Sequence, residues 1–215
     1  MINNDTRKKL ADIIHGNVIE GQNGTLSAAC NNLRGSFTTN TKIKKDFDYQ
    51  STIKEKQKEH LIEFINQHQL WHPDISEDKY LTEGGEAKIY FGGDNKTVVK
   101  LNDAIYYSTW LDFFNSILIH NLFFDRTAYA LKGFIQKGNV LCAILEQPFI
   151  IADNPTVIAD IKTFLNYNGF EIVRRYDYYN KQLGLLLEDI HDENVLTNAN
   201  TLFFIDTVFY IDVDE

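Results

Sequence analysis

The chain has 215 residues, of which 44% are hydrophobic, and its formal net charge is −9 with a pI near 5.1. This length suffices for one sizeable core or two small lobes and is too short for three domains. The acidic balance argues against a nucleic-acid partner, because binding to a phosphate backbone relies on clustered Lys and Arg. It is compatible with a smaller anionic ligand, since a few basic groups and bound cations can form a locally positive site.

Neither the cysteines nor the hydropathy pattern points to export or to a membrane. Cys30 and Cys142 are the only cysteines, and they are too far apart in dissimilar surroundings to indicate a disulfide framework or a zinc site. The N-terminus lacks an apolar stretch long enough for a secretory signal, and no segment approaches the roughly 18 apolar residues of a membrane span. We therefore expect a soluble cytoplasmic protein with no membrane partner.

The first 75 residues are expected to be a helical extension. A short amphipathic helix starts at Asp5 or Thr6, and residues 21–40, rich in Gly, Asn, Ser and Thr, predict a loop with room for one helical turn. Residues 51–71 predict the strongest helix of this part, capped by Ser51 or Thr52 and stopped before Pro73.

From residue 79 the hydrophobic period changes from helical to strand-like. Residues 79–101 predict three strands joined by turns, and the broad apolar face of residues 103–124 predicts one helix. Residues 129–150 predict a hairpin turning near Lys137–Gly138, and residues 154–170 predict a helix with Pro155 at its start and Gly169 at its end. Residues 171–190 predict a β-rich stretch turning near Asn180–Lys181. A final strand pair is expected with its tip at 198–200 and its second arm over 201–212.

Two features of the strand region suit an anionic ligand. The turn "TEGGEAKI" contains Gly84–Gly85, whose unhindered backbone N–H groups can approach phosphate oxygens, although a glycine pair in a β-turn is often only a turn. Lys100 ends the strongly apolar run "TVVK" and is either a snorkelling edge residue or a phosphate-binding cation.

The stretch "LEDIHDENVL" concentrates carboxylates, a histidine and an amide immediately after an apolar run. It is either a solvated turn or a loop that holds a catalytic base and a metal ligand. Asp189 and Asn194 stand five positions apart in it, and Asp206 follows in "FFIDTVF". Carboxylate and amide oxygens are the hard ligands that Mg²⁺ prefers.

Taken in order, the glycine turn, Lys100, Asp189, Asn194 and Asp206 resemble the motifs of the protein-kinase-like superfamily. The resemblance implies an ATP- and Mg²⁺-dependent phosphotransferase. Gly84, Gly85 and Lys100 would bind the nucleotide phosphates, and Lys100 would act in catalysis as the phosphate clamp. Asp189, rather than Asp192, would be the catalytic base, and Asn194 and Asp206 would bind the metal.

Glu146 follows an apolar strand at the place where a kinase hinge contacts adenine through its backbone, so the resemblance adds it to the cofactor-binding residues. "DIHDEN" is also similar to the "HGDLHxxN" loop of aminoglycoside-phosphotransferase-like kinases. More narrowly, "GGEAKIY", "HNLFF…TAYALKGF" and "LEDIHDENVL" resemble the polyvalent protein kinase domains of bacterial phages and mobile elements, over about residues 60–215.

The sequence departs from the kinase pattern in three respects. No Glu lies between Glu86 and Glu146 to pair with Lys100, and Asp112 is the nearest acidic residue on the predicted helix. No activation segment follows Asp206. A β-rich stretch over 171–187 replaces the long helix that precedes the catalytic loop, so the large lobe would be minimal.

The expected fold is α+β, a reduced protein-kinase-like fold with an antiparallel small-lobe sheet and one helix, preceded by a helical N-terminal segment. The expected domains are 1–75 (helical extension), 76–150 (small lobe) and 151–215 (minimal large lobe). Three functions compete: a phosphotransferase whose acceptor, protein or small molecule, the sequence does not identify; a catalytically inactive pseudokinase that binds nucleotide or protein in a mobile element; and a structural domain without a nucleotide site.

Overall fold

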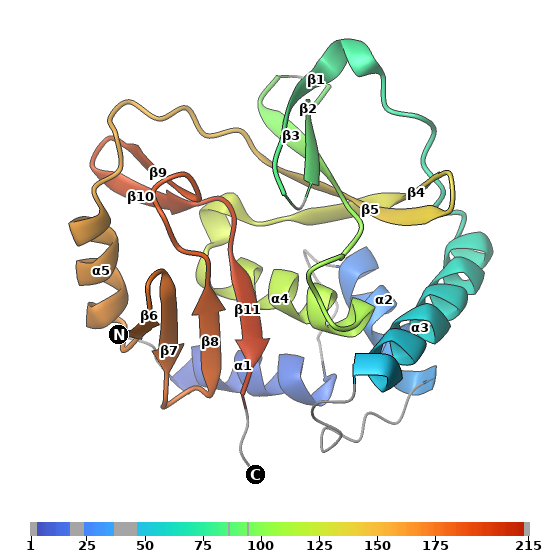
Figure 1. Cartoon of the computed structure of the whole chain (residues 1–215), viewed down its shortest axis with the longest axis horizontal. Coiled ribbons are helices and arrows are strands. Elements are labelled where there is room, and N and C mark those ends of the chain that lie inside the picture. Colours follow the sequence, from blue (N-terminus) through green and yellow to red (C-terminus); the bar gives the residue numbers. More distant parts are fainter. Residues whose placement is uncertain (1–3, 18–23, 37–46, 86, 94, 213–215) are drawn as a thin grey trace. The chain divides into compact units, whose positions relative to one another are not determined.

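The computed structural model describes residues 4–17, 24–36, 47–85, 87–93 and 95–212 and divides the chain into two compact units. Unit 1 comprises Met1–Asn17, Ile119–Ala128 and Ile150–Glu215, and unit 2 comprises Val18–Leu118 and Tyr129–Phe149. The elements of both units are labelled in Figure 1.

Helices and antiparallel sheets alternate along the chain, which confirms the expected α+β class. Within the described residues the α-helices are α1 (Asn4–His15), α2 (Gly24–Ser36), α3 (Phe47–His68), α4 (Trp110–Phe123) and α5 (Ile158–Tyr167). The strands are β1 (Tyr80–Glu83), β2 (Ala87–Phe91), β3 (Thr97–Asn102), β4 (Ala130–Lys137), β5 (Val140–Pro148), β6 (Glu171–Arg174), β7 (Asp177–Asn180), β8 (Leu185–Glu188), β9 (Val195–Asn198), β10 (Thr201–Phe204) and β11 (Val208–Ile211). Two short 3₁₀ helices, η1 (Glu77–Lys79) and η2 (Asp125–Thr127), precede β1 and β4.

Unit 2 is built on a five-stranded antiparallel sheet in the order β1-β2-β3-β5-β4. Successive residues of a strand point to opposite faces, so Lys100 and Leu101 of β3 lie on different sides of this sheet. The Leu101 face carries a cluster of buried residues: Tyr90, Leu101, Ile135, Cys142 and Ile144. The Lys100 face receives α4, whose Phe114 ring lies 6.3 Å from that of Phe134.

The expectation of a loop over residues 21–40 was wrong for Gly24–Ser36, which form helix α2; residues 21–23 and 37–40 lie outside the described residues. The buried α2 residues Leu26, Ala29, Cys30 and Leu33 recur at helical spacing. Because two of these are small, the apolar face is easily overlooked beside the surrounding Gly, Asn and Ser. Helix α3 begins at Phe47, earlier than its expected cap at Ser51. Figure 1 shows α2, α3 and α4 on the same side of β4 and β5.

Helix α3 also fixes the start of α4. Lys54 donates hydrogen bonds to the carbonyls of Ala104 and Tyr107, and the fully buried side chain of Gln57 accepts the backbone N–H of Leu111 at 3.1 Å. Burial lowers the pKa of the Lys54 ammonium, with nearby carboxylates opposing the shift. The helix expected from residue 103 begins only at Trp110: Ala104 adopts a positive φ of 57° that is not helical, and the Thr109 hydroxyl accepts the Asp112 N–H at the start of the helix.

Unit 1 contains the sheet β11-β8-β7-β6 and the separate hairpin β9–β10. Aromatic rings form much of its core: Phe124 stacks on Phe204 at 4.3 Å, and Phe123 on Phe209 at 5.8 Å. The stretch over 171–190 contains three strands, with turns before Asp177 and after Asn180. Helix α5 starts three residues after Pro155, and Gly169 follows its last turn with φ +80°, as expected of a helix-terminating glycine.

None of the helices in the described ranges combines the length and the apolar character that crossing a lipid bilayer requires.

Replacing Gln57 with Leu is expected to lower the free energy of unfolding by up to about 1 kcal/mol, because the Leu111 N–H in the first turn of α4 loses its buried acceptor, an effect that removal of the buried Gln57 Nε2 partly offsets. The change should be visible as a lower melting temperature by circular dichroism. Gln67→Leu is the matched control, since Gln67 lies exposed in the same helix. Equal effects of the two substitutions would contradict a capping role for Gln57.

Candidate functional site

The acidic residues nominated from the sequence lie together at one end of the β8–β11 pair in unit 1. Val208 of β11 is the register partner of Glu188, directly before Asp189. The backbone carbonyl of Asn194 accepts the N–H groups of Ile205 at 3.0 Å and of Asp206 at 3.3 Å. The chain around Asn194 is thereby joined to the chain around Asp206, so the two nominated metal ligands are neighbours.

Asp189 is held in an uncommon backbone conformation. Its φ is +61°, a left-handed value that costs a non-glycine residue energy and that Asp tolerates better than most. Its backbone N–H donates to the carboxylate of Asp177 at 3.2 Å, and the N–H of Ile190 donates to the Tyr176 carbonyl. The Asp189 side chain is 61% exposed and therefore accessible to a ligand. Strained backbone of this kind is often found at functional sites.

The side chain of Asn194 is turned toward Asp189. Its Nδ2 donates to the Asp189 carbonyl at 2.9 Å and to the Asp189 carboxylate at 3.1 Å. His191 completes the group, with Nε2 at 3.1 Å from Asn194 Nδ2 and 3.5 Å from Asp189 Oδ1. Because the amide nitrogen donates hydrogen bonds to Asp189, the amide oxygen Oδ1 is the atom through which Asn194 can bind a cation.

Negative charge accumulates around this loop. Partial burial raises the pKa of the Glu188 carboxyl, and the charges of Asp177 and Asp189 raise it further, while Arg174 acts in the opposite direction. A cation placed here would relieve this repulsion, because it offsets several carboxylates at once.

The residues nominated for nucleotide binding belong to unit 2. Lys100 is 5% exposed, and its ammonium donates to the hydroxyl of Tyr129 at 3.1 Å while lying 5.2 Å from the centre of the same ring. Sequence reasoning missed Tyr129, although a tyrosine at the start of the "YALKGF" strand offered both a polar and a π-electron partner for a buried lysine.

Asp112, the suggested substitute for the missing helix glutamate, forms part of the cap of α4. The Thr109 hydroxyl donates to the Asp112 carboxylate at 2.7 Å and accepts the Asp112 N–H at 3.1 Å, as in a capping box. Burial raises the pKa of the Asp112 carboxyl; the Thr109 hydrogen bonds and the Lys54 charge oppose that shift.

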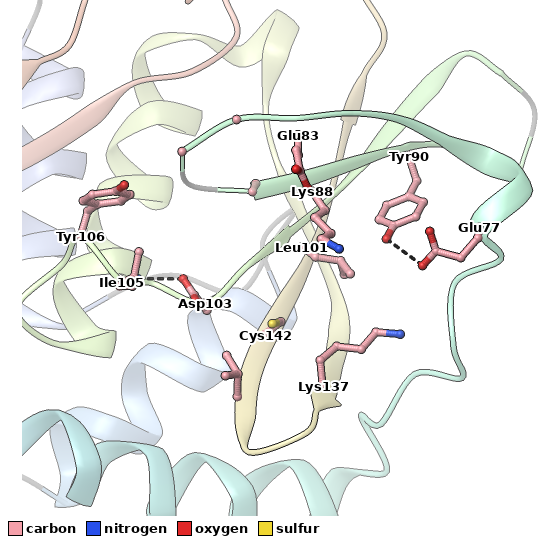
Figure 2. Close-up of a pocket in the computed structure, with 14 residues that line it drawn as sticks. Glu77, Glu83, Lys88, Tyr90, Leu101, Asp103, Ile105, Tyr106, Lys137 and Cys142 are labelled. Atoms are coloured by element: carbon pink, nitrogen blue, oxygen red, sulfur yellow. Dashed lines mark hydrogen bonds between the residues drawn. The ribbon is translucent and has the colours of Figure 1, made fainter.

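The glycine turn closes between β1 and β2 through a hydrogen bond from the Gly84 N–H to the Ala87 carbonyl at 3.0 Å. A side chain at Gly85 would meet the Tyr106 hydroxyl, since an added Cβ would lie 3.3 Å from that oxygen. Both glycines line a cavity of about 490 Å³, and Figure 2 shows Leu101 and Cys142 among its lining residues. Because Leu101 lines it, this cavity lies on the sheet face opposite to Lys100.

Glu146 lies inside β5, paired with Val99 of β3 on one side and with Ala130 of β4 on the other. Its carboxylate contacts Lys132 at 3.3 Å and the Thr97 hydroxyl at 3.5 Å. Since both edges of β5 are engaged in the ladder at this position, backbone contact with a ligand is easier from residues that follow Pro148.

The donor set around Asp206 fits a magnesium ion that also binds phosphate. No group of three or more His, Cys, Asp or Glu side chains that could hold a metal occurs within the described ranges. Magnesium sites in nucleotide-binding enzymes instead use one or two protein oxygens, with the remaining positions filled by phosphates and water. One carboxylate, Asp206, and one amide, Asn194, suit that arrangement.

Comparison with known families agrees with this geometry. A family model described as "Serine/Threonine/Tyrosine Kinase found in polyvalent proteins" matches residues 54–213. The chain belongs to this kinase family. The match includes every nominated site residue from Gly84 to Asp206 and begins inside α3, so it takes in part of the expected N-terminal extension. None of the curated proteins compared with the chain matches it.

Membership of this kinase family confirms the resemblance drawn from the sequence motifs. It suggests phosphotransferase activity and implies a nucleotide substrate, ATP, together with magnesium. The family description leaves the phosphate acceptor open, and the roles of individual residues remain predictions.

Asp112→Asn is expected to raise stability at neutral pH. The Asp112 pKa is higher in the folded chain than its ordinary value of 3.8, so ionisation is disfavoured in the folded state. The wild-type chain therefore loses stability, relative to the neutral asparagine, as pH rises through the folded pKa. The advantage of the variant should disappear as pH falls below about 3.8, measured by urea unfolding over a pH series.

Asp160→Asn serves as the matched control, because Asp160 lies exposed in the first turn of α5. A carboxylate there is favoured by the helix dipole by about 0.3–1 kcal/mol, so this variant should lose stability at neutral pH. The same sign for both variants would refute the burial argument for Asp112.

Proposed function

We propose that the chain is an ATP- and Mg²⁺-dependent phosphotransferase with Asp189 as its catalytic base and Lys100 as its phosphate clamp. The observation that carries the proposal is the linkage made by Asn194, whose side chain binds Asp189 and whose carbonyl binds the Asp206 backbone. Membership of a kinase family supports the same reaction class.

In this mechanism the exposed carboxylate of Asp189 accepts a hydrogen bond from the attacking hydroxyl of the acceptor and takes up its proton. Asn194 keeps that carboxylate in place through its amide N–H groups. Asp206 and the Asn194 amide oxygen would hold Mg²⁺, which neutralises phosphate charge when bound.

Lys100 would contribute a second positive charge for the phosphates. Its ammonium is already desolvated and oriented by Tyr129, so little reorganisation is needed on binding. Gly85 would offer its backbone N–H group to the phosphate oxygens, and Gly84, whose N–H donates to the Ala87 carbonyl, would shape the turn so that its backbone can approach them. The proposal keeps residues 76–150 as a kinase-like small lobe, residues 151–215 as a minimal large lobe and residues 1–75 as a helical extension.

A catalytically inactive nucleotide-binding protein is the second candidate, and the position of Asp112 favours it. In kinases a helix glutamate pairs with the strand lysine, whereas the Asp112 carboxylate is engaged with Thr109 in the cap of α4. The two functions share the nucleotide site and differ in whether the phosphate is transferred.

ATP with Mg²⁺ is expected to raise the melting temperature of the wild-type chain, because a ligand that binds only the folded state stabilises it by mass action. Asp206→Ala should lose the Mg²⁺-dependent part of this shift. Asp192→Ala is the control, since Asp192 lies exposed in the same acidic loop. The absence of any shift in the wild type at millimolar ATP would contradict both the enzyme and the inactive nucleotide-binding protein.

Asp189→Asn is expected to reduce phosphate transfer by about 10²-fold or more while nucleotide binding is retained, since general-base catalysis contributes on that order. Release of phosphate from ATP and mass increments of 80 Da on the chain itself are the measurements, because water and the protein are acceptors always present. Asp192→Asn should behave as the wild type. Wild-type ATP binding without measurable transfer to either acceptor, unchanged in Asp189→Asn, would favour the inactive form.

A further inference from the structure

A fully buried histidine contacts the residue that follows Asp206. His120, in the last turn of α4, has no exposed surface and lies between Thr127 and Thr207, which are 1% and 7% exposed. Its Nδ1 is 2.7 Å from the Thr207 hydroxyl, and its Nε2 is 3.0 Å from the Thr127 carbonyl and 3.3 Å from the Thr127 hydroxyl. All three residues belong to unit 1.

For a neutral His120 ring, the Thr127 carbonyl determines the direction of each hydrogen bond. A carbonyl oxygen can only accept, so the neutral His120 ring carries its proton on Nε2 and donates it to Thr127. Nδ1 is then an acceptor, and the Thr207 hydroxyl must donate to it. The ring thus holds the Thr207 side chain in one orientation.

Thr207 directly follows Asp206 in the chain, so its anchoring bears on the Asp206 backbone. The Asp206 N–H reaches the Asn194 carbonyl at 3.3 Å, which is long for a backbone hydrogen bond, and regular strand pairing resumes only at Val208. Thr207 lies between these two points, and its buried hydroxyl attaches this segment to His120 of α4.

We propose that His120 is a positioning residue for Asp206. By accepting the Thr207 hydroxyl it fixes the peptide that carries Asp206, and so holds the Asp206 carboxylate where it binds the metal. This role rests on the proposed function, in which Asp206 is a Mg²⁺ ligand. The sequence analysis did not connect Thr207 with His120. A lone histidine in the apolar run "SILIHNLFF" was the available signal, because a buried polar side chain needs partners.

The two hydroxyls on either side of the ring provide a matched pair of variants. Thr207→Val and Thr127→Val each remove one buried hydroxyl that contacts His120, but only the first lies beside Asp206. Groups that orient a metal ligand typically change metal affinity by about 10–100-fold when removed. We therefore expect Thr207→Val to raise by at least about tenfold the Mg²⁺ concentration that gives half of the ATP-dependent thermal shift, and Thr127→Val to leave it within about threefold. Thr207→Ser should restore the wild-type value.

Substitutions at His120 test the same point from the other partner. His120→Asn places an amide oxygen near the position of Nδ1 and can still accept the Thr207 hydroxyl, whereas His120→Gln reaches the Thr127 carbonyl and loses the acceptor for Thr207. His120→Asn should therefore need less Mg²⁺ than His120→Gln. Equal Mg²⁺ requirements in Thr207→Val and Thr127→Val would overturn the proposal, because they would show a general loss of packing.

A measurement without nucleotide separates this inference from the proposed function. Hydrogen–deuterium exchange of a peptide covering residues 202–208 should be faster in Thr207→Val than in the wild type and unchanged in Thr127→Val. A wild type with no Mg²⁺-dependent shift would refute the proposed function and with it the metal-binding role of Asp206. Equal exchange in the two valine variants would refute the positioning of Asp206 by Thr207, whatever the nucleotide result.

Discussion

The acidic site depends on the two groups that Asn194 presents to its surroundings. Its backbone carbonyl accepts the N–H groups of Ile205 and Asp206, and its side-chain amide donates to Asp189. One residue therefore ties the segment around Asp189 to the segment around Asp206, next to the point where Glu188 of β8 pairs with Val208 of β11. The spacing of five positions between Asp189 and Asn194 allows this, because the intervening loop can turn back on itself with Asp189 in the left-handed conformation. An aspartate tolerates that conformation better than a β-branched residue would.

A second constraint concerns the cost of burying Lys100. A lysine in a sheet that packs against a helix must lose most of its hydration, and that loss is unfavourable unless other groups replace the water. In unit 2 the hydroxyl and the ring of Tyr129 do so without supplying a negative charge. Tyr129 therefore replaces part of the hydration that the Lys100 ammonium loses on burial in β3.

Local patterns predicted most of the elements and the order of the site residues, whereas contacts between distant residues escaped them. The alternation of apolar and polar residues, together with the glycines in turns, was sufficient to predict strands β1 to β5. The chain order of Lys100, Asp189, Asn194 and Asp206 indicated the correct family. Helix α2 was missed because Ala29 and Cys30 are weak hydrophobic signals within a polar stretch. Tyr129 and His120 were missed because their partners lie 29 and 87 positions away, beyond any local period.

In the proposed function, the charge distribution gives a physical reason for the small number of protein ligands that a metal ion would have at this site. Asp177 and Asp189 already raise the pKa of Glu188, so each further carboxylate at this end of β8 and β11 would add repulsion in the unliganded chain. An amide at position 194 supplies a hard oxygen without adding charge. As proposed metal ligands, Asp206 and Asn194 would limit the repulsion between carboxylates and leave most of the coordination of a cation to phosphate oxygens, which would make metal binding depend on the nucleotide. The same limit on negative charge makes the orientation of the single carboxylate, Asp206, more important than it would be in a site with three or four acidic ligands.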